Sequence, residues 1–345
     1  MSDVSTPDPA ARTKQAGPET WAVKQPFGWR TLLIGLLVLV FMTDSARRLE
    51  LGDFAEQVSH LAEAALGLRE TSQIGDAVSR IGSDMFPLAF EERTPVTRIE
   101  GFDADRLPPF SRLEEVEAAE RRMNPDTLQL ETVVHRETVL VEPAGYLVFV
   151  LGKMLETIEI ALWATMAAVL LSVPLAYASA RNFAPNILVY GAARGGVGFL
   201  RSMPELVTAL FLVLAFGFGP LAGILALALH GAGFLGKFYA DDVEAADAGP
   251  QDALRAIGAG PVKVLRIAVL PQILPGLTAQ TLYLLDRNVR MAAVVGLVGG
   301  GGIGQELKGR YDLFEYDKVG TILLVLFVTV ILLDQTAARI RRRLI

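Results

Sequence analysis

The chain has 345 residues, of which 52% are hydrophobic, 20% are charged and none is cysteine. The formal net charge is −6 and is unevenly spread, because residues 46–143 hold 11 Lys and Arg against 20 Asp and Glu. This composition excludes a disordered chain, a disulfide scaffold and thiolate metal sites, and it argues against a nucleic-acid binder, which would carry a basic patch.

Six apolar stretches are typical of membrane-spanning helices, each of which needs about 20 mostly apolar residues. They cover residues 29–42, 157–178, 204–218, 221–235, 276–298 and 319–333, and the third is entered from a helix that starts near Ile187. The second and sixth are too long and too poor in charge for the core helices of a water-soluble protein. We therefore expect an all-α membrane protein with a bundle of six transmembrane helices.

The first apolar stretch is interpreted as an uncleaved anchor over residues 29–45, because no small-residue cleavage site follows it. Lys and Arg in short flanks set the orientation. The C-terminal residues 339–345 contain four arginines, so we expect a cytoplasmic basic tail there. Six crossings then place residues 1–28 in the cytoplasm as well, with residues 144–338 holding helices 2–6.

The acidic residues 46–143 are expected to form a folded periplasmic α+β insert between helices 1 and 2. Apolar residues recur at steps of three and four from Leu51 to Leu68, which predicts one helix. Ser111 and Glu114 resemble a capping box that opens a second helix through Met123. Residues 128–141 have strand-like stretches on either side of His135.

The sequence offers no energy source or reaction centre of its own. No Walker loop, metal cluster or nucleophile triad can be assembled from it, and neither His60 nor His135 has a neighbouring Cys or a second His at ligand spacing. We therefore expect no catalytic residue, no metal and no cofactor. Energy must come from an ion gradient or from a partner.

The expected cytoplasmic loop of residues 238–275 contains a spaced motif. Asp252, Ala253 and Leu254 are followed after three residues by Gly258, and nine residues later comes Ala-Val-Leu-Pro, which ends in Leu270 and Pro271. We expect a helix over residues 251–257, a turn at Gly258 with positive φ, and a second helix over 262–269 that Pro271 stops.

This loop resembles the signature loop of the permease subunits of bacterial ABC importers: Glu-Ala-Ala, three residues, Gly, nine residues, Ile-x-Leu-Pro. Asp252, Leu254 and Ala268 depart from that pattern, while its spacing is kept throughout. The resemblance implies a six-helix type I importer permease in the inner membrane. It also implies that the loop docks on ATPase subunits, and that a second permease copy and a periplasmic binding protein are partners.

Further segments look like the phosphonate-importer branch of these permeases. They are ARNFAP at 180–185, RSMPEL at 201–206, VLPQI at 269–273, NVR at 288–290 and VGGGGIGQEL at 298–307. The similarity covers residues 156–333, about half of the chain, and leaves the 46–143 insert uncovered. The resemblance implies a path for phosphonates or related phosphorus oxyanions.

A polar segment that includes three ionisable residues interrupts the fifth apolar stretch, where ionisable side chains are costly and function is the first hypothesis. Asp286 and Arg290 lie four residues apart and can pair on one helix face. Arg287 has no obvious partner, and an unpaired arginine or Asn288 would suit an oxyanion in the pore. Two alternatives stay open: these residues line the translocation path, or they lock the bundle through helix–helix salt bridges.

The glycine-rich segment after that stretch is a candidate gate or hinge. Its glycines allow bending and close backbone approach. A hinge, a substrate-lining surface and close packing are all compatible with them, and we favour a mobile gate element. The residues are Gly299, Gly300, Gly301, Gly302 and Gly304.

We therefore predict an ATP-driven inner-membrane importer permease for phosphonates or related phosphorus oxyanions. A first alternative is a permease of the same build for phosphate, phosphite, methionine or a polar amino acid. A second is a gradient-driven secondary transporter or channel, and a third is a membrane-anchored sensor whose 46–143 block binds a ligand. Membrane lipid is expected around the chain, and nucleic acid is not expected as a partner.

Overall fold

The computed structural model describes residues 28–344 except 69–70, 105 and 124–129, so most of the predicted tail of residues 1–28 lies outside the described residues. The chain divides into two compact units, residues 1–79 and 80–345. α1 (Trp29–Arg48) and α2 (Leu51–Ala65) belong to the first unit, and α3 (Gln73–Met85) crosses the boundary. The helix predicted after Leu51 is thus confirmed.

α1 presents apolar side chains on all sides. None of its residues is buried, and Leu36 and Phe41 are both more than half exposed. Soluble proteins rarely expose so large an apolar surface to water, so this 20-residue helix fits a lipid environment.

A three-stranded antiparallel sheet precedes the helical bundle in the second unit. Its strands are β1 (Glu92–Pro95), β2 (Arg112–Met123) and β3 (Leu130–Glu142), in the order β1-β3-β2. β3 pairs along its length with β2, in a register that sets Leu113 opposite Leu140. The strand-like stretches predicted on either side of His135 are confirmed from residue 130 onward as one strand that runs through His135, and residues 128–129 lie outside the described residues.

The helix predicted from Ser111 through Met123 is wrong, because these residues form β2. The Ser111 hydroxyl donates to the carbonyl oxygen of Pro108 instead of capping a helix. Glu114 pairs with Arg112, two residues away on the same side of the strand. The ladder to β3 outweighs the local helix preference of this Glu- and Ala-rich segment.

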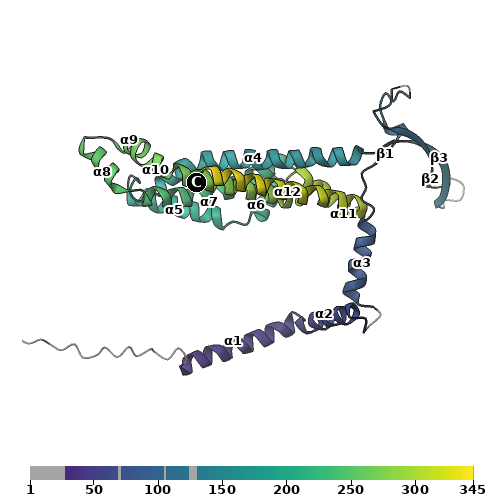
Figure 1. Cartoon of the computed structure of the whole chain (residues 1–345), viewed down its shortest axis with the longest axis horizontal. Helices are drawn as coiled ribbons and strands as arrows, with labels where there is room; N and C mark the ends of the chain where they lie inside the picture. The colour runs from purple at the N-terminus through teal and green to yellow at the C-terminus, as the bar shows by residue number, and fades with distance from the viewer. Residues whose placement is uncertain (1–27, 69–70, 105, 124–129, 345) are drawn as a thin grey trace, which may run out of the picture. The chain divides into compact units, whose positions relative to one another are not determined.

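The second unit is dominated by a helical bundle. α4, α7, α10 and α12 run side by side in it, α8 and α9 lie at one end, and α11 lies at the other (Figure 1). The helices are α4 (Gly145–Ser179), α5 (Ile187–Ser202), α6 (Glu205–Phe216), α7 (Pro220–Ala245), α8 (Ala248–Ala256), α9 (Pro261–Val264), α10 (Leu270–Gly296), α11 (Gly302–Asp312) and α12 (Tyr316–Leu344).

The described helices supply five of the six predicted membrane spans, and the sixth if a bent pair of helices counts as one span. Five are long and apolar enough to cross a membrane: α1, α4, α7, the continuous helix Pro261–Gly296, and α12. α5 and α6 would form the sixth span together, broken by a bend of 89°. Pro204 follows Ser202 and Met203 at this break, where a helix cannot continue unbroken.

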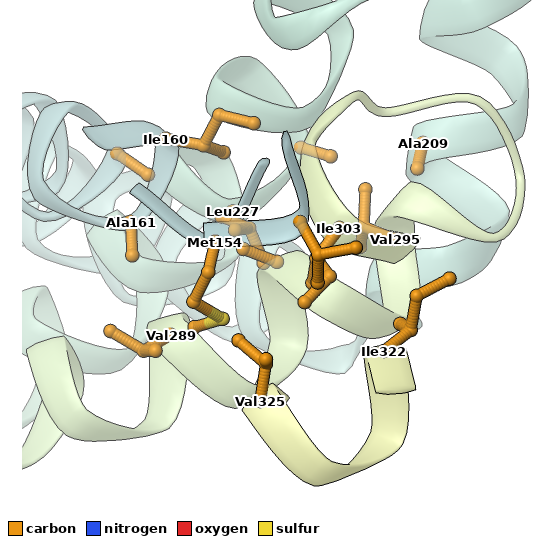
Figure 2. Close-up of a cluster of buried hydrophobic side chains, with 14 of the residues drawn as sticks. Met154, Ile160, Ala161, Ala209, Leu227, Val289, Val295, Ile303, Ile322 and Val325 are labelled. Carbon is orange, nitrogen blue, oxygen red and sulfur yellow. The ribbon is translucent and has the colours of Figure 1, made fainter. Parts of the chain in front are cut away.

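Small residues let α4 and α7 approach closely. A Cβ on Gly231 of α7 would lie 2.8 Å from the Cβ of Ala168 on α4, and Ala161, Ala164 and Ala226 are fully buried. Larger side chains such as Ile160, Leu227 and Ile303 fill the neighbouring core (Figure 2). Such small-residue contacts hold helices together in lipid, where burial of apolar surface gives little driving force.

Pro271 does not stop the second helix of the signature loop, contrary to the prediction. A π-helical turn, η2 (Leu265–Val269), links α9 to α10, and Pro271 lies in the first turn of α10. Proline lacks an N–H, and a change of hydrogen-bond register at this point lets the helix pass through it. The loop therefore connects to α10 through one continuous helix.

Candidate functional site

The signature loop begins with a capped helix at the end of α7. The side chain of Asp247 accepts a hydrogen bond from the N–H of Gly249 at 3.1 Å and caps α8. The amide of Gln251, only 3% exposed, donates to the carbonyl oxygens of Ala246 and Asp247, each at 3.1 Å. Gln251 was not among the predicted site residues, although a glutamine beside the motif was visible in the sequence.

Gly258 ends α8 in the predicted conformation. Its φ is +82°, and its N–H donates to the carbonyl oxygen of Arg255. A Cβ at this position would meet no atom within 4 Å, so the backbone angle and not the available space requires glycine.

The loop presents one open face and one packed face. Asp252, Ala253, Gly258, Leu270 and Pro271 are exposed, and Leu254 packs against the buried core cluster. Val264 and Val269 anchor the second half of the loop in the same cluster. Exposed Ile257, Val262 and Ile267 add apolar surface to this end of the bundle. A surface of this kind, on a rigid base, suits a protein partner.

Within α10, Asp286 and Arg290 form a complete ion pair. The two guanidinium Nη atoms donate to the two carboxylate oxygens at 3.2 and 2.6 Å, as the spacing predicts. Asn288, 2% exposed, donates to Thr165 Oγ1 on α4 at 2.9 Å. Asn288 therefore ties α10 to α4 inside the bundle.

Arg287 has a partner, and the prediction that it lacks one is wrong. Its Nη2 donates to Glu205 Oε1 at the start of α6, and Nε2 of His230 on α7 lies 3.3 Å from the same oxygen. Nδ1 of His230 lies 3.2 Å from the carbonyl oxygen of Met203. Both Glu205 and His230 fall inside predicted spans, so the rule that flags ionisable intramembrane residues would have found them too.

The glycine-rich segment forms the tight connection between α10 and α11. Gly299, Gly301 and Gly302 have positive φ values of +99°, +85° and +69°. A Cβ on Gly304 would overlap the carbonyl oxygen of Ala293. Close packing, one of the three interpretations, describes this geometry; motion of the segment stays a prediction.

Side chains of α4 hold the first turn of α11. Glu156 Oε1 accepts from the N–H of Gly302 at 3.0 Å, and Thr157 Oγ1 accepts from the N–H of Ile303 at 2.8 Å. These contacts satisfy donors that a helix leaves free at its N-terminus.

An ionic cluster joins α11 to the start of α12. Arg310 donates to Glu306 at 2.6 Å and to Glu315 at 2.8 Å, and Lys318 lies 3.1 Å from Glu315. Burial alone would raise the pKa of Glu315, but hydrogen bonds from Arg310 and Lys318 outweigh it and hold that pKa below its ordinary value. Burial opposes the charge of Arg310 as well, and its two carboxylate partners raise its pKa nevertheless.

No group of three or more His, Asp or Glu side chains in the described part of the chain is arranged to hold a metal ion. The polar groups of the bundle are instead spread over ion pairs and hydrogen bonds between helices. Five candidate spans, or six if α5 and α6 count as one, with a helix–glycine–helix loop at one end of the bundle, describe a multi-pass membrane protein.

Comparisons with known proteins identify the family. Residues 151–345 match the model of the binding-protein-dependent transport system inner membrane component. The chain therefore belongs to this family, the permease subunits of ABC importers, in which the ATPase is a separate subunit.

Two curated relatives and one solved structure illustrate the similarity. A putative phosphite transport system permease protein of Stutzerimonas stutzeri is 53% identical over 261 residues, 76% of this chain and 100% of the relative. A phosphate-import permease protein of Mycolicibacterium smegmatis is 41% identical over 190 residues, 55% of this chain and 36% of the relative. A chain of the MetNI methionine ABC transporter in an inward-facing conformation shares the fold, with a TM-score of 0.50 and 23% identity, over 57% of this chain and 96% of that chain.

Proposed function

We propose that this permease forms the path by which phosphonates or related phosphorus oxyanions, phosphite among them, enter the cell. The observation that carries the proposal is the 53% identity to the putative phosphite transport system permease protein, which extends over that relative's full length. A transported oxyanion needs donors inside the membrane, and the arginines of α10 supply them. Asp286, Arg287, Asn288 and Arg290 are the proposed lining of the path.

The signature loop is proposed to couple this path to ATP hydrolysis. Asp252, Ala253, Gly258, Leu270 and Pro271 present the open face that would dock on the ATPase, and Leu254 packs beneath it against the core. Movement of the docked loop would pass through the continuous helix Pro261–Gly296 to the polar residues of α10. The chain itself is proposed to catalyse no covalent chemistry.

The assembly is proposed to hold two copies of this permease, two ATPase subunits and a periplasmic binding protein. Both termini would be cytoplasmic, because the arginines at the C-terminal end favour that side and six crossings, with α5 and α6 counted as one, return the chain to it. Residues 46–143 would then face the periplasm. The loop of Gly299, Gly300, Gly301, Gly302 and Gly304 would lie at the outer end of α10 and act as a gate.

Uptake into proteoliposomes tests the function. The complex of permease, ATPase and binding protein is supplied with ATP inside the vesicles and with radiolabelled methylphosphonate or phosphite outside. ATP-dependent uptake that unlabelled phosphite inhibits and methionine does not is the expected result. Uptake of methionine alone would reassign the solute, and uptake that needs an ion gradient but no ATP would support a secondary transporter.

A further inference from the structure

Three helices bring Glu205, His230 and Arg287 together inside the bundle. Their side chains are 13%, 13% and 26% exposed, so the cluster is largely removed from solvent. One carboxylate oxygen, Glu205 Oε1, contacts both the arginine and the histidine. The ion pair between Glu205 and Arg287 thus uses one guanidinium nitrogen and one carboxylate oxygen.

The second terminal nitrogen of Arg287 has no partner. Among the described residues, only Arg287 Nη1 and Gln280 Oε1 are buried side-chain polar atoms without a hydrogen bond. A buried donor left unpaired is costly, more so on a charged group. The neighbouring pair shows what a satisfied arrangement looks like, because Arg290 uses both Nη atoms and Asp286 both oxygens.

A tetrahedral phosphorus oxyanion could accept the hydrogen bond from Arg287 Nη1 that Glu205 leaves unmade. It presents two or more oxygens to a guanidinium, whose planar donors suit bidentate contact. Glu205 competes for the same group with a single oxygen. If the carboxylate is displaced from Arg287, it stays beside His230, whose Nε2 lies 3.3 Å from Oε1 while Nδ1 lies 3.2 Å from the carbonyl oxygen of Met203. An imidazolium, with both ring nitrogens protonated, would donate to both oxygens.

We propose that Arg287 is the intramembrane binding group for the transported oxyanion, and that Glu205 is an internal carboxylate that occupies Arg287 when no substrate is bound. The identity of the anion rests on the proposed function; the exchange between Glu205 and a bound anion is a separate claim. His230 is a positioning residue that retains Glu205 during the exchange. Asp286 and Arg290, whose two carboxylate oxygens and two Nη atoms pair with one another, keep their places during that exchange.

Ligand-induced stabilisation of the purified permease–ATPase complex, measured as a thermal shift with millimolar methylphosphonate, tests this exchange. Glu205→Gln removes the competitor, so the apparent affinity should rise several-fold. Arg287→Gln combined with Glu205→Gln removes the binding group without leaving a buried charge, and the affinity should fall about tenfold or more. If Glu205 and Arg287 only hold the helices together, Glu205→Gln should not raise the apparent affinity for methylphosphonate, and that result would overturn the proposal.

The control variant neutralises another ion pair of the bundle whose side chains are similarly exposed. Arg310 and Glu306 are 26% and 16% exposed, close to the values for Arg287 and Glu205. The double variant Arg310→Gln, Glu306→Gln should keep wild-type affinity. Should the Arg287 double variant fail to assemble, Arg287→Lys keeps the charge but loses the planar donors, and it should still lower affinity about tenfold. Wild-type affinity in Arg287→Lys contradicts the proposal.

Failure of this inference is distinguishable from failure of the proposed function. If wild-type complex imports methylphosphonate but the Arg287 double variant binds and imports it equally well, only the binding group is wrong. If wild-type complex neither imports methylphosphonate or phosphite nor is stabilised by them, the proposed substrate class fails, and the exchange claim fails with it for these anions.

Discussion

Thr157 of α4 accepts a hydrogen bond from the backbone N–H of Ile303, 146 residues later in the chain, at 2.8 Å. Both residues are fully buried. The contact fixes the start of α11, and with it the glycine-rich connection from α10, to α4 of the bundle.

Replacing Thr157 by Val keeps its shape and removes the acceptor. The Ile303 N–H is then buried without a partner, so the free energy of unfolding should fall by about 1–3 kcal/mol. Thermal unfolding in detergent measures the change. Thr336→Val is the control, because exposed Thr336 hydrogen-bonds only within its own helix, to Leu332; equal losses in the two variants would disprove the bridging role.

Gly304→Ala should destabilise the fold by about 1–3 kcal/mol or more, since the added methyl group would overlap the carbonyl oxygen of Ala293. Gly309 lies in the same helix, and a Cβ there would meet nothing within 4 Å. Gly309→Ala should therefore leave stability unchanged or raise it by up to about 1 kcal/mol. Thermal unfolding of both variants checks the contrast, and a stable Gly304→Ala variant would contradict it.

Gly258→Val should abolish uptake while the protein stays in the membrane. Valine is strongly disfavoured at a φ of +82°, so the end of α8 must change shape although there is space for the side chain. Gly260, two residues on, has a φ of −69° and equally open surroundings. Gly260→Ala should therefore transport normally. Normal uptake by Gly258→Val would count against the coupling role of the loop.

Acid should weaken the ionic cluster at Glu315. A carboxylate whose pKa is depressed in the folded state stabilises the protein above its unfolded-state pKa, and this contribution is lost as pH falls through the lower folded-state value. Glu315→Gln should therefore lower the unfolding temperature at pH 7, and the difference from wild type should shrink as pH falls below about 4.5. Exposed Glu63→Gln is the control, and a difference that is constant with pH would refute the assignment.

The spans could be predicted well because a helix in lipid needs a long run of apolar residues, and such a run is visible within one short segment of the sequence. The positive φ of Gly258 was likewise predictable, since it depends on one residue type at the end of a helix. Ser111 to Met123 was mispredicted because its strand partner lies in β3, outside the local window. The partner of Arg287 could not be read from spacing, because Glu205 lies 82 residues away. The passage of the helix through Pro271 depends on a π-helical turn that periodicity does not reveal.

The central claim is that the loop of α8 and α9 faces the cytosol and docks on an ATPase. Because the chain has no cysteine, Asp252→Cys provides a single reactive site. We expect a membrane-impermeant maleimide to label it in inverted vesicles stripped of ATPase, to label it less when the ATPase is present, and to leave it unlabelled in intact spheroplasts. Labelling of Asp252→Cys from the outside of intact spheroplasts would contradict the account.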